Sequence, residues 1–406
     1  MNVELFDYHT GGHHLEFCRK HLNFLNNKEK INAHVVTLGH DKRYDEFFQD
    51  KEVKYLDTEH KSFYNKITNN LDNPRLIKLE VLKHHLNSRN IDVVHLMQID
   101  DILNELYTVF SDHNLDTRII GSINGAFFSS RTTVGKVVSE MYKYSLPTIL
   151  LNMIPPRGRD PAMYHCLNNK LLDAVFVPTS GGNRYLKNRF PVKKNKIVTV
   201  PDPVEPWYTE NMSQIEARRN LNLPENDQLL LFFGELRESK GINELLDAIS
   251  GYSGPEFSLV IVGSPVDVTE EEIITACQDG SVNCIHRLEF IPEADVKDYF
   301  ISADRIILPY QSEVGDYQPS NVFQKSCAAR RPVIAPDRGF FQNRMNQIDS
   351  GISVKPMSPE NIRSAIKDWL THRDDNISKN VITEYVNNQS FERWSEIMYQ
   401  KYIGLQ

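Results

Sequence analysis

The sequence predicts an α/β protein with two domains, each a doubly wound parallel sheet of the Rossmann-like kind, and a helix at the C-terminus. Short apolar, β-branched runs alternate with segments of helical length along the chain, which is the pattern of βαβ units. The 406 residues exceed what one ordinary hydrophobic core accommodates. One proline-rich segment near the middle, Val200–Tyr208, interrupts the alternation and indicates a crossing between domains.

Six strands are predicted in the first half of the chain, enough for one complete doubly wound sheet. They are Val3–Phe6, His34–Leu38, Val93–Leu96, Ile119–Ile123, Ala174–Pro178 and Ile197–Val200. The segment Val200–Tyr208 has three prolines in nine residues, and prolines block regular structure. We therefore predict domains over residues 1–203 and 204–380.

The second half repeats the alternation and predicts a second sheet of buried parallel strands. The predicted strands are Leu229–Gly234, Phe257–Gly263, Cys284–Ile291, Arg305–Tyr310 and Arg331–Pro336. Apolar residues at helical spacing predict helices over Ile242–Ser250 and Pro292–Ala303. Residues 381–406 end in an amphipathic helix, and the sequence leaves open whether it crosses back to the first domain.

Composition limits the classes of function. The net charge of −8 gives no reason to expect a nucleic-acid partner. The five cysteines are scattered and contain no Cys-x-x-Cys pair, so neither a zinc site nor a disulfide framework is predicted, and a reducing cytoplasm fits best. No secretory signal and no run long enough to span a membrane is visible.

The run LLLFFGELRESKGINELLDAI, residues 229–249, is the most informative about chemistry. An apolar strand is followed by Gly234, by Arg237 and Lys240, and then by a helix. A glycine allows close approach of a ligand, a helix start offers free N–H groups, and two cations can each contact a phosphoryl group of a diphosphate. The alternative is an ordinary strand-to-helix turn with solvated charges.

Further runs match one family in order along the chain. They are YHTGGHHLEF near the start, IDVVHLMQ (91–98), LLDAVFVPTS (171–180), KIVTVPDPVEP before the second domain and SNVFQKSCAARRPVIAPDRG (320–339). With the loop above, the chain resembles family 4 of the retaining glycosyltransferases, a group 1 glycosyltransferase family. The resemblance implies the GT-B fold, in which two Rossmann-like domains face each other across a cleft.

The resemblance also implies a reaction. It is the transfer of a hexose-type sugar, with retention of configuration, from a nucleotide-diphosphate sugar to a glycan or lipid-linked acceptor, as in polysaccharide or glycan biosynthesis. The catalytic residues would be Arg237 and Lys240, which neutralise the departing diphosphate in place of a metal. No metal and no cofactor other than the nucleotide-sugar co-substrate is therefore expected. His9, His13 and His14 form the densest histidine group, and no carboxylate or cysteine pattern accompanies them.

Other site residues follow from the matched runs. On the donor side the backbone at Gly234 and at Ser320, Asn321 and Val322 would meet the diphosphate, with Ser320 as a helix cap. On the acceptor side, Gly11 and Gly12 allow close backbone approach, and His13 is a candidate contact. The alternative for the glycine pair is a simple tight turn.

The chain departs from the family pattern in two places. The usual pair of donor-binding glutamates falls on Tyr317 and Lys325, and the Lys325 ammonium cannot accept the hydrogen bonds of a ribose. Glu313 and Asp316 lie just upstream, and one of these carboxylates, with Glu313 as the candidate site residue, would contact the sugar from a displaced loop; a solvated loop acid is the alternative. Asn124 stands where the family often has a histidine; it can bind a sugar hydroxyl but cannot exchange protons.

Two basic segments in the first half are candidate contacts for anions. Arg157 and Arg159 suit an anionic group such as an acceptor phosphate, and a plain surface loop is the alternative. Arg184–Lys196 carries six cations with Tyr185, Leu186 and Phe190 interleaved. It predicts peripheral contact with anionic lipid at the inner face of a membrane, each cation contributing about 1 kcal/mol. A solvated helix-loop face is the alternative.

Two further functions stay open. A catalytically inactive, glycosyltransferase-like binding or scaffold protein is compatible with Tyr317 and Lys325 at the glutamate positions. The same two-domain fold also carries sugar-nucleotide epimerases and phosphorylases, because fold alone does not settle function.

Overall fold

The structure is a computed structural model of the chain that describes residues 1–7, 14–49, 52–112, 115–124, 126–128, 159–207, 212–278, 282–311, 317–348, 351–372 and 379–405. The chain forms two compact units. The N-terminal unit comprises Met1–Pro201 and Phe391–Gln406, and the C-terminal unit comprises Asp202–Ser390. The division between Pro201 and Asp202 falls inside the proline-rich segment. Both units are parallel α/β sheets, as the sequence predicts.

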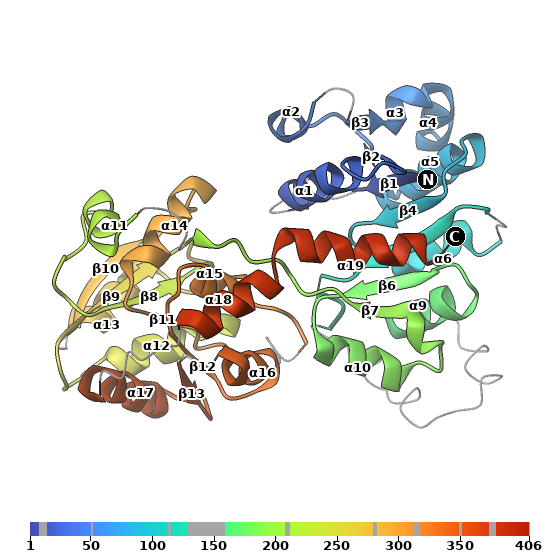
Figure 1. The fold of residues 1–406 in the computed structure, drawn as a ribbon. Coiled ribbons are helices and arrows are strands. Elements are labelled where there is room, and N and C mark those ends of the chain that lie inside the picture. Colours follow the sequence, from blue (N-terminus) through green and yellow to red (C-terminus); the bar gives the residue numbers. More distant parts are fainter. Residues whose placement is uncertain are drawn as a thin grey trace. The chain divides into compact units, whose positions relative to one another are not determined.

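The N-terminal unit is built on a seven-stranded sheet in the order β3-β2-β1-β4-β5-β6-β7, with every neighbouring pair parallel (Figure 1). The strands are β1 (Asn2–Phe6), β2 (Asn32–Thr37), β3 (Val53–Tyr55), β4 (Val93–Leu96), β5 (Arg118–Ser122), β6 (Ala174–Val177) and β7 (Ile197–Thr199). The prediction of six strands was one too few, because β3 has only three residues and carries Lys54 and Tyr55, which hide the apolar pattern of a strand.

Helices connect these strands. They are α1 (His14–Asn26), α2 (Lys42–Phe47), α3 (Leu56–Glu59), α4 (Lys61–Thr68), α5 (Pro74–Ser88), α6 (Leu103–Phe110), α9 (Arg159–Asn168), α10 (Ser180–Arg189) and α19 (Phe391–Ile403), with short 3-10 turns η1 (Ala126–Phe128) and η2 (Lys194–Lys196). The local sequence determines where α5 begins. The Asn73 side chain caps the helix by accepting a hydrogen bond from the N–H of Arg75 at 2.9 Å, and Pro74 occupies its first position.

The C-terminal unit has a six-stranded parallel sheet in the order β10-β9-β8-β11-β12-β13. The strands are β8 (Leu229–Phe233), β9 (Phe257–Val262), β10 (Val282–Arg287), β11 (Arg305–Ile307), β12 (Val333–Pro336) and β13 (Ile352–Val354). The helices are α11 (Gln214–Asn220), η4 (Glu238–Lys240), α12 (Ile242–Ile249), α13 (Glu270–Gln278), α14 (Glu293–Ser302), α15 (Asn321–Ala328), α16 (Gly339–Ile348), α17 (Pro359–His372) and α18 (Lys379–Asn388). The three-residue β13 is absent from the prediction.

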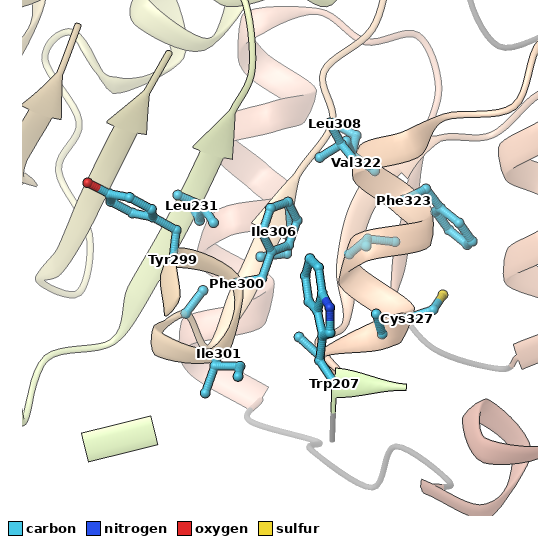
Figure 2. Packing of buried hydrophobic residues seen from close by; sticks show 14 of the residues in the cluster. Trp207, Leu231, Tyr299, Phe300, Ile301, Ile306, Leu308, Val322, Phe323 and Cys327 are labelled. Carbon is cyan, nitrogen blue, oxygen red and sulfur yellow. The ribbon is translucent and has the colours of Figure 1, made fainter. Parts of the chain in front are cut away.

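A continuous apolar core lies between this sheet and α14 and α15 (Figure 2). Trp207 reaches into it from the segment that follows the division between the units, and its ring lies 5.8 Å from that of Phe300. Leu308, just after β11, and Val322, in the first turn of α15, lie together at one end of the cluster. This packing fixes the start of α15 next to the end of β11.

The last helix, α19, is held to the N-terminal unit by a buried polar chain. Tyr402 Oη lies 3.0 Å from His21 Nε2 and 2.7 Å from His95 Nδ1, and His95 Nε2 lies 2.7 Å from Ser122 Oγ. Among the described residues, His21 Nδ1 has no hydrogen-bond partner. The proton of neutral His21 can sit on Nδ1, where the N–H would be unpaired, or on Nε2. An unpaired buried N–H costs more than an unpaired acceptor, so His21 carries its proton on Nε2 and donates to Tyr402. Tyr402 then donates to His95, and His95 donates to Ser122. Burial lowers the pKa of His95 to about 3.

One cysteine pair corrects the sequence analysis. Cys277 on α13 and Cys284 on β10 form a disulfide, a pairing that their separation of seven residues did not predict. Cys18, Cys166 and Cys327 are free and buried.

In the basic segment Arg184–Lys196, the interleaved Leu186 and Phe190 are buried in the unit. The predicted contact of its cations with anionic lipid stays a prediction. Arg189 is also buried and pairs with Asp160, with 2.8 Å between Nε and Oδ2. None of the described helices combines the length and the apolar character that a membrane crossing needs.

Candidate active site

The order of the C-terminal sheet reverses between β8 and β11. In a parallel α/β sheet the loops that leave the carboxyl ends of these two strands diverge, and ligands bind in the resulting crevice. β8 is followed by Gly234 and the loop to Gly241, and β11 is followed by Leu308–Gln311. The predicted donor-binding residues of the first run therefore lie at the position where this topology places a ligand.

The loop that follows β8 folds back against the segment that follows β11. Gly241 has a φ of 76°, and a Cβ atom at this position would lie 1.9 Å from the backbone oxygen of Pro309. Gln311 adds a backbone bond, its N–H donating to the Ser239 oxygen at 3.0 Å. Only glycine allows this combination of left-handed backbone and close approach. The contact fixes the loop that carries both predicted catalytic cations.

Lys240 lies over the end of β8. Its Nζ is 2.9 Å from the point where a Cβ of Gly234 would stand, and the same point is 4.0 Å from Val322 Cγ2. Gly234, Lys240 and Val322 are thus brought together. Burial lowers the pKa of the Lys240 ammonium, Glu235 opposes this shift, and Arg237 adds to it. A partly desolvated ammonium at this position is suited to pair with an anionic ligand.

Arg237 is placed differently. Its side chain is 47% exposed and its Nε lies 2.9 Å from Glu235 Oε2. This ion pair sits on the same loop as Lys240, so a diphosphate bound there would compete with Glu235 for the guanidinium. Exposed ion pairs of this kind contribute less than about 1 kcal/mol, so moving the guanidinium from Glu235 to a diphosphate would cost little free energy.

The start of α15 completes the described part of this site. Ser320 caps the helix, its Oγ accepting from the N–H of Phe323 at 3.2 Å, and it is buried. Its hydroxyl also lies 3.4 Å from that of Tyr310, whose pKa burial raises to about 12. The first-turn N–H groups of α15, at Asn321 and Val322, lie at the helix end where anions are stabilised.

Lys325 contacts a different part of the unit. Its Nζ lies 5.7 Å from the centre of the Trp207 ring, a cation–π contact. Tyr317 is half-buried ahead of α15. Glu313, the candidate carboxylate for the sugar, lies outside the described residues.

The N-terminal unit presents polar groups at the carboxyl ends of β4 and β5. Asn124 is exposed, and its Nδ2 lies 3.5 Å from Oε1 of Gln98. Buried Asp100 orders this edge, because its carboxylate accepts from the N–H groups of Asn124 at 2.9 Å and Phe127 at 2.7 Å. The sequence analysis missed Gln98 and Asp100, although polar residues directly after a buried strand are the signal that would have found them.

The remaining predicted acceptor residues, Gly11, Gly12 and His13, lie outside the described part of the chain, as does Arg157. Arg159 opens α9, and its Nη1 donates to the Phe127 oxygen at 3.2 Å. Arg159 therefore supports the turn η1 beside Asn124.

One group of described residues has the composition of a metal site, and the sequence analysis missed it. Ligand atoms of Glu59, His60 and His85 all lie within 4.8 Å of one another. His60 Nε2 is 2.9 Å from His85 Nδ1, and His85 Nε2 is 2.9 Å from Oε2 of Glu4. The two imidazoles and Glu4 thus satisfy one another by hydrogen bonds. The prediction that the reaction uses no metal stays a prediction.

Comparison with known proteins shows what the chain is similar to. Residues 213–387 match the family described as glycosyl transferases group 1. An uncharacterized glycosyltransferase of Methanocaldococcus jannaschii is 23% identical over 207 residues, which are 48% of this chain and 52% of that protein. A GDP-mannose:glycolipid 4-beta-D-mannosyltransferase of Xanthomonas campestris is 27% identical over 148 residues, 34% of this chain and 40% of that protein. The chain thus spans about half the length, or less, of these curated relatives.

The fold is shared along the whole chain. The crystal structure of Anabaena HepE in complex with UDP superposes with a TM-score of 0.69 at 11% identity, covering 100% of both chains. The protein has the GT-B fold, which is the class that the two sheets define.

Proposed function

We propose that the chain is a retaining glycosyltransferase that transfers a hexose-type sugar from a nucleotide-diphosphate sugar to a glycan or lipid-linked acceptor. The observation that carries the proposal is the position of Lys240, a partly desolvated ammonium over the end of β8, within the domain that matches the group 1 family. The names of two similar proteins, one with GDP-mannose and one in complex with UDP, support a nucleotide-bound donor.

Charge neutralisation of the leaving group would supply the catalysis. The bond between the sugar carbon and the donor diphosphate breaks, and the diphosphate leaves with an additional negative charge. Lys240 and Arg237 stabilise that charge more strongly in the transition state than in the bound donor, which lowers the barrier. A metal ion would then be unnecessary.

Retention follows if the acceptor attacks on the face from which the diphosphate departs. The acceptor oxygen forms its bond to the sugar carbon, and its proton passes to an oxygen of the leaving phosphate. Asn124 orients a sugar hydroxyl in this scheme and exchanges no proton. Gln98 and Asp100 are positioning residues, because they hold the side chain and the backbone of Asn124.

The test is turnover of a panel of nucleotide sugars, with and without EDTA, by the wild type and by Lys240→Ala and Arg237→Ala. The matched control is Arg219→Ala, since Arg219 is also exposed and paired with a nearby glutamate, Glu225, at 2.9 Å. We expect both loop variants to lose about 100-fold or more in turnover, EDTA to have no effect, and the control to match the wild type. Unchanged rates in both loop variants would remove the catalytic part of the proposal.

Assays of the same purified protein distinguish a binding or scaffold protein from an active transferase. Binding of nucleoside diphosphates without hydrolysis or transfer for any acceptor would favour a binding protein, whereas measurable donor hydrolysis would exclude it. For a phosphorylase, absorbance of bound pyridoxal phosphate in the purified protein is the distinguishing signal.

A further inference from the structure

A pocket of about 620 Å³ opens in the N-terminal unit, away from the residues discussed above. It is lined by the start of β5, by the ends of α6 and α9, and by the segments that precede β5, β6 and β7. Because the strands are parallel, this is the amino edge of the sheet. Asn124 and Gln98 lie at the opposite, carboxyl edge, so the pocket is separate from the predicted acceptor side.

The described lining of this pocket is cationic. Arg118, Lys170, Lys193 and Lys196 contribute positive charges, and Asp173 contributes the one carboxylate among those lining residues. Asp173 accepts from the N–H of Ile119 at 3.0 Å and lies 3.5 Å from Nη1 of Arg118. The carboxylate is therefore engaged with Arg118 and the backbone.

The fold itself accounts for one of these cations. Lys196 Nζ donates to the backbone oxygens of Leu167 and Leu172, each at 2.7 Å. Lysines commonly satisfy carbonyls at a helix end in this way. Burial lowers the pKa of Lys196, Asp173 opposes the shift, and Lys193 and Lys170 add to it.

Within the described part of the chain, no side-chain hydrogen bond or ion pair gives Lys170 or Lys193 such a structural role. Both are exposed at the rim. Lys170 has a φ of 61°, in the left-handed region where glycine or asparagine is favoured after a helix. A lysine in this conformation is strained relative to those residues, and it adds a cation to the rim of the pocket. Strain kept at such a position is a reason to look for a ligand.

We propose that this pocket binds a phosphorylated small molecule of the size of a sugar phosphate. Its volume lies in the range of small-molecule sites and exceeds what a bare phosphate occupies. Lys170, Lys193 and Arg118 pair with the phosphoryl oxygens, since charge-assisted bonds to phosphate are the strong ones. Asn168 and Asn169 line the same pocket, and carboxamides hydrogen-bond hydroxyl groups. The proposal is independent of the proposed transferase activity.

The test is calorimetric titration of the full chain, at constant ionic strength, with glucose 6-phosphate, inorganic phosphate and glucose. The variant Lys170→Asn/Lys193→Gln removes two rim charges, and asparagine tolerates the backbone at residue 170. The matched control is Lys194→Gln, an exposed neighbour that does not line the pocket. We expect saturable binding of glucose 6-phosphate, none of glucose, a loss of about tenfold or more in the double variant, and no change in the control.

Two results would overturn the proposal. Equal binding of glucose 6-phosphate by the wild type and the double variant would place the phosphate elsewhere, for example at Lys240. The proposal is also overturned if neither glucose 6-phosphate nor inorganic phosphate binds saturably. Sedimentation with vesicles of phosphatidic acid in phosphatidylcholine distinguishes a lipid headgroup from a soluble phosphate as the ligand. If the wild type binds the vesicles but not glucose 6-phosphate, and the double variant does not bind the vesicles, the ligand is a lipid headgroup.

Discussion

Acidification is expected to release the C-terminal helix α19 from the N-terminal unit. The helix is held through Tyr402, whose hydroxyl lies between the imidazoles of His21 and His95. Both histidines are fully buried. Burial lowers the pKa of His21 well below its ordinary value, and that of His95 to about 3. Both imidazoles therefore stay neutral in the folded protein at pH values where the unfolded chain binds protons.

The sign and size of the effect follow from linkage. A histidine whose folded pKa is lowered contributes stability that is present above its unfolded pKa of about 6.5 and is lost as the pH falls below it. Between pH 6.5 and 5.0 each buried histidine removes about 1.5 to 2 kcal/mol, so the pair removes about 3 to 4 kcal/mol. The pKa values of His34 and His60 are also lowered, and these residues add in the same direction.

Hydrogen exchange of the backbone amides of Phe391–Ile403, corrected for intrinsic rates, measures this loss directly. Protection should fall by about 100-fold or more from pH 6.5 to 5.0. The amides of α12, in the C-terminal unit, report the pH dependence that arises elsewhere. Equal protection of α19 at the two pH values would refute the assignment of two neutral, buried imidazoles.

Two substitutions test the packing around α19 and the loop after β8. Tyr402→Phe leaves ring nitrogens of two buried histidines without their shared partner and should lower the free energy of unfolding by about 2 to 4 kcal/mol. The control Tyr399→Phe, on the same helix, should lower it by less than about 0.5 kcal/mol. Equal losses of unfolding free energy in urea titrations of the two variants would contradict the buried polar chain. Gly241→Ala places a methyl group 1.9 Å from the Pro309 oxygen and should cost several kcal/mol and weaken nucleotide binding. Gly251→Ala, with a φ of 62° and nothing within 4 Å, should cost only about 1 kcal/mol of backbone strain; similar costs in the two glycine variants would show that the close approach at Gly241 relaxes freely.

The sequence predicted most of the fold because buried parallel strands are continuous apolar runs. β8 is such a run, β9 departs from it only at Ser258, and β1 departs from it at Asn2 and Glu4; the structure confirms strands at all three. β3 and β13 escaped prediction because three residues that include Lys54 or Ser353 carry too little apolar pattern. Their pairing depends on neighbouring strands, β2 and β12, which the local sequence does not contain.

The candidate site was predictable only where its residues are close in sequence. Gly234, Arg237 and Lys240 lie on one loop, so their spacing could be recognised. Contacts between segments distant in the sequence could not be predicted in this way. Tyr402 contacts His95, which is 307 residues away in the sequence, and His60 contacts His85, which is 25 residues away. The disulfide between Cys277 and Cys284 joins α13 to β10, and no cysteine spacing encodes it.

The two loop cations should contribute unequally to the proposed reaction. Lys240 is already partly desolvated over the end of β8, so part of the cost of removing its hydration is met by folding, and a bound diphosphate would gain a partner without rearrangement. Arg237 is exposed and must first leave Glu235. Lys240→Ala should therefore reduce turnover more than Arg237→Ala, and Glu235→Gln, which frees the guanidinium, should lower the KM for the donor while leaving kcat nearly unchanged. A larger loss in Arg237→Ala would mean that the exposed guanidinium, rather than the preorganised ammonium, carries most of the leaving-group stabilisation.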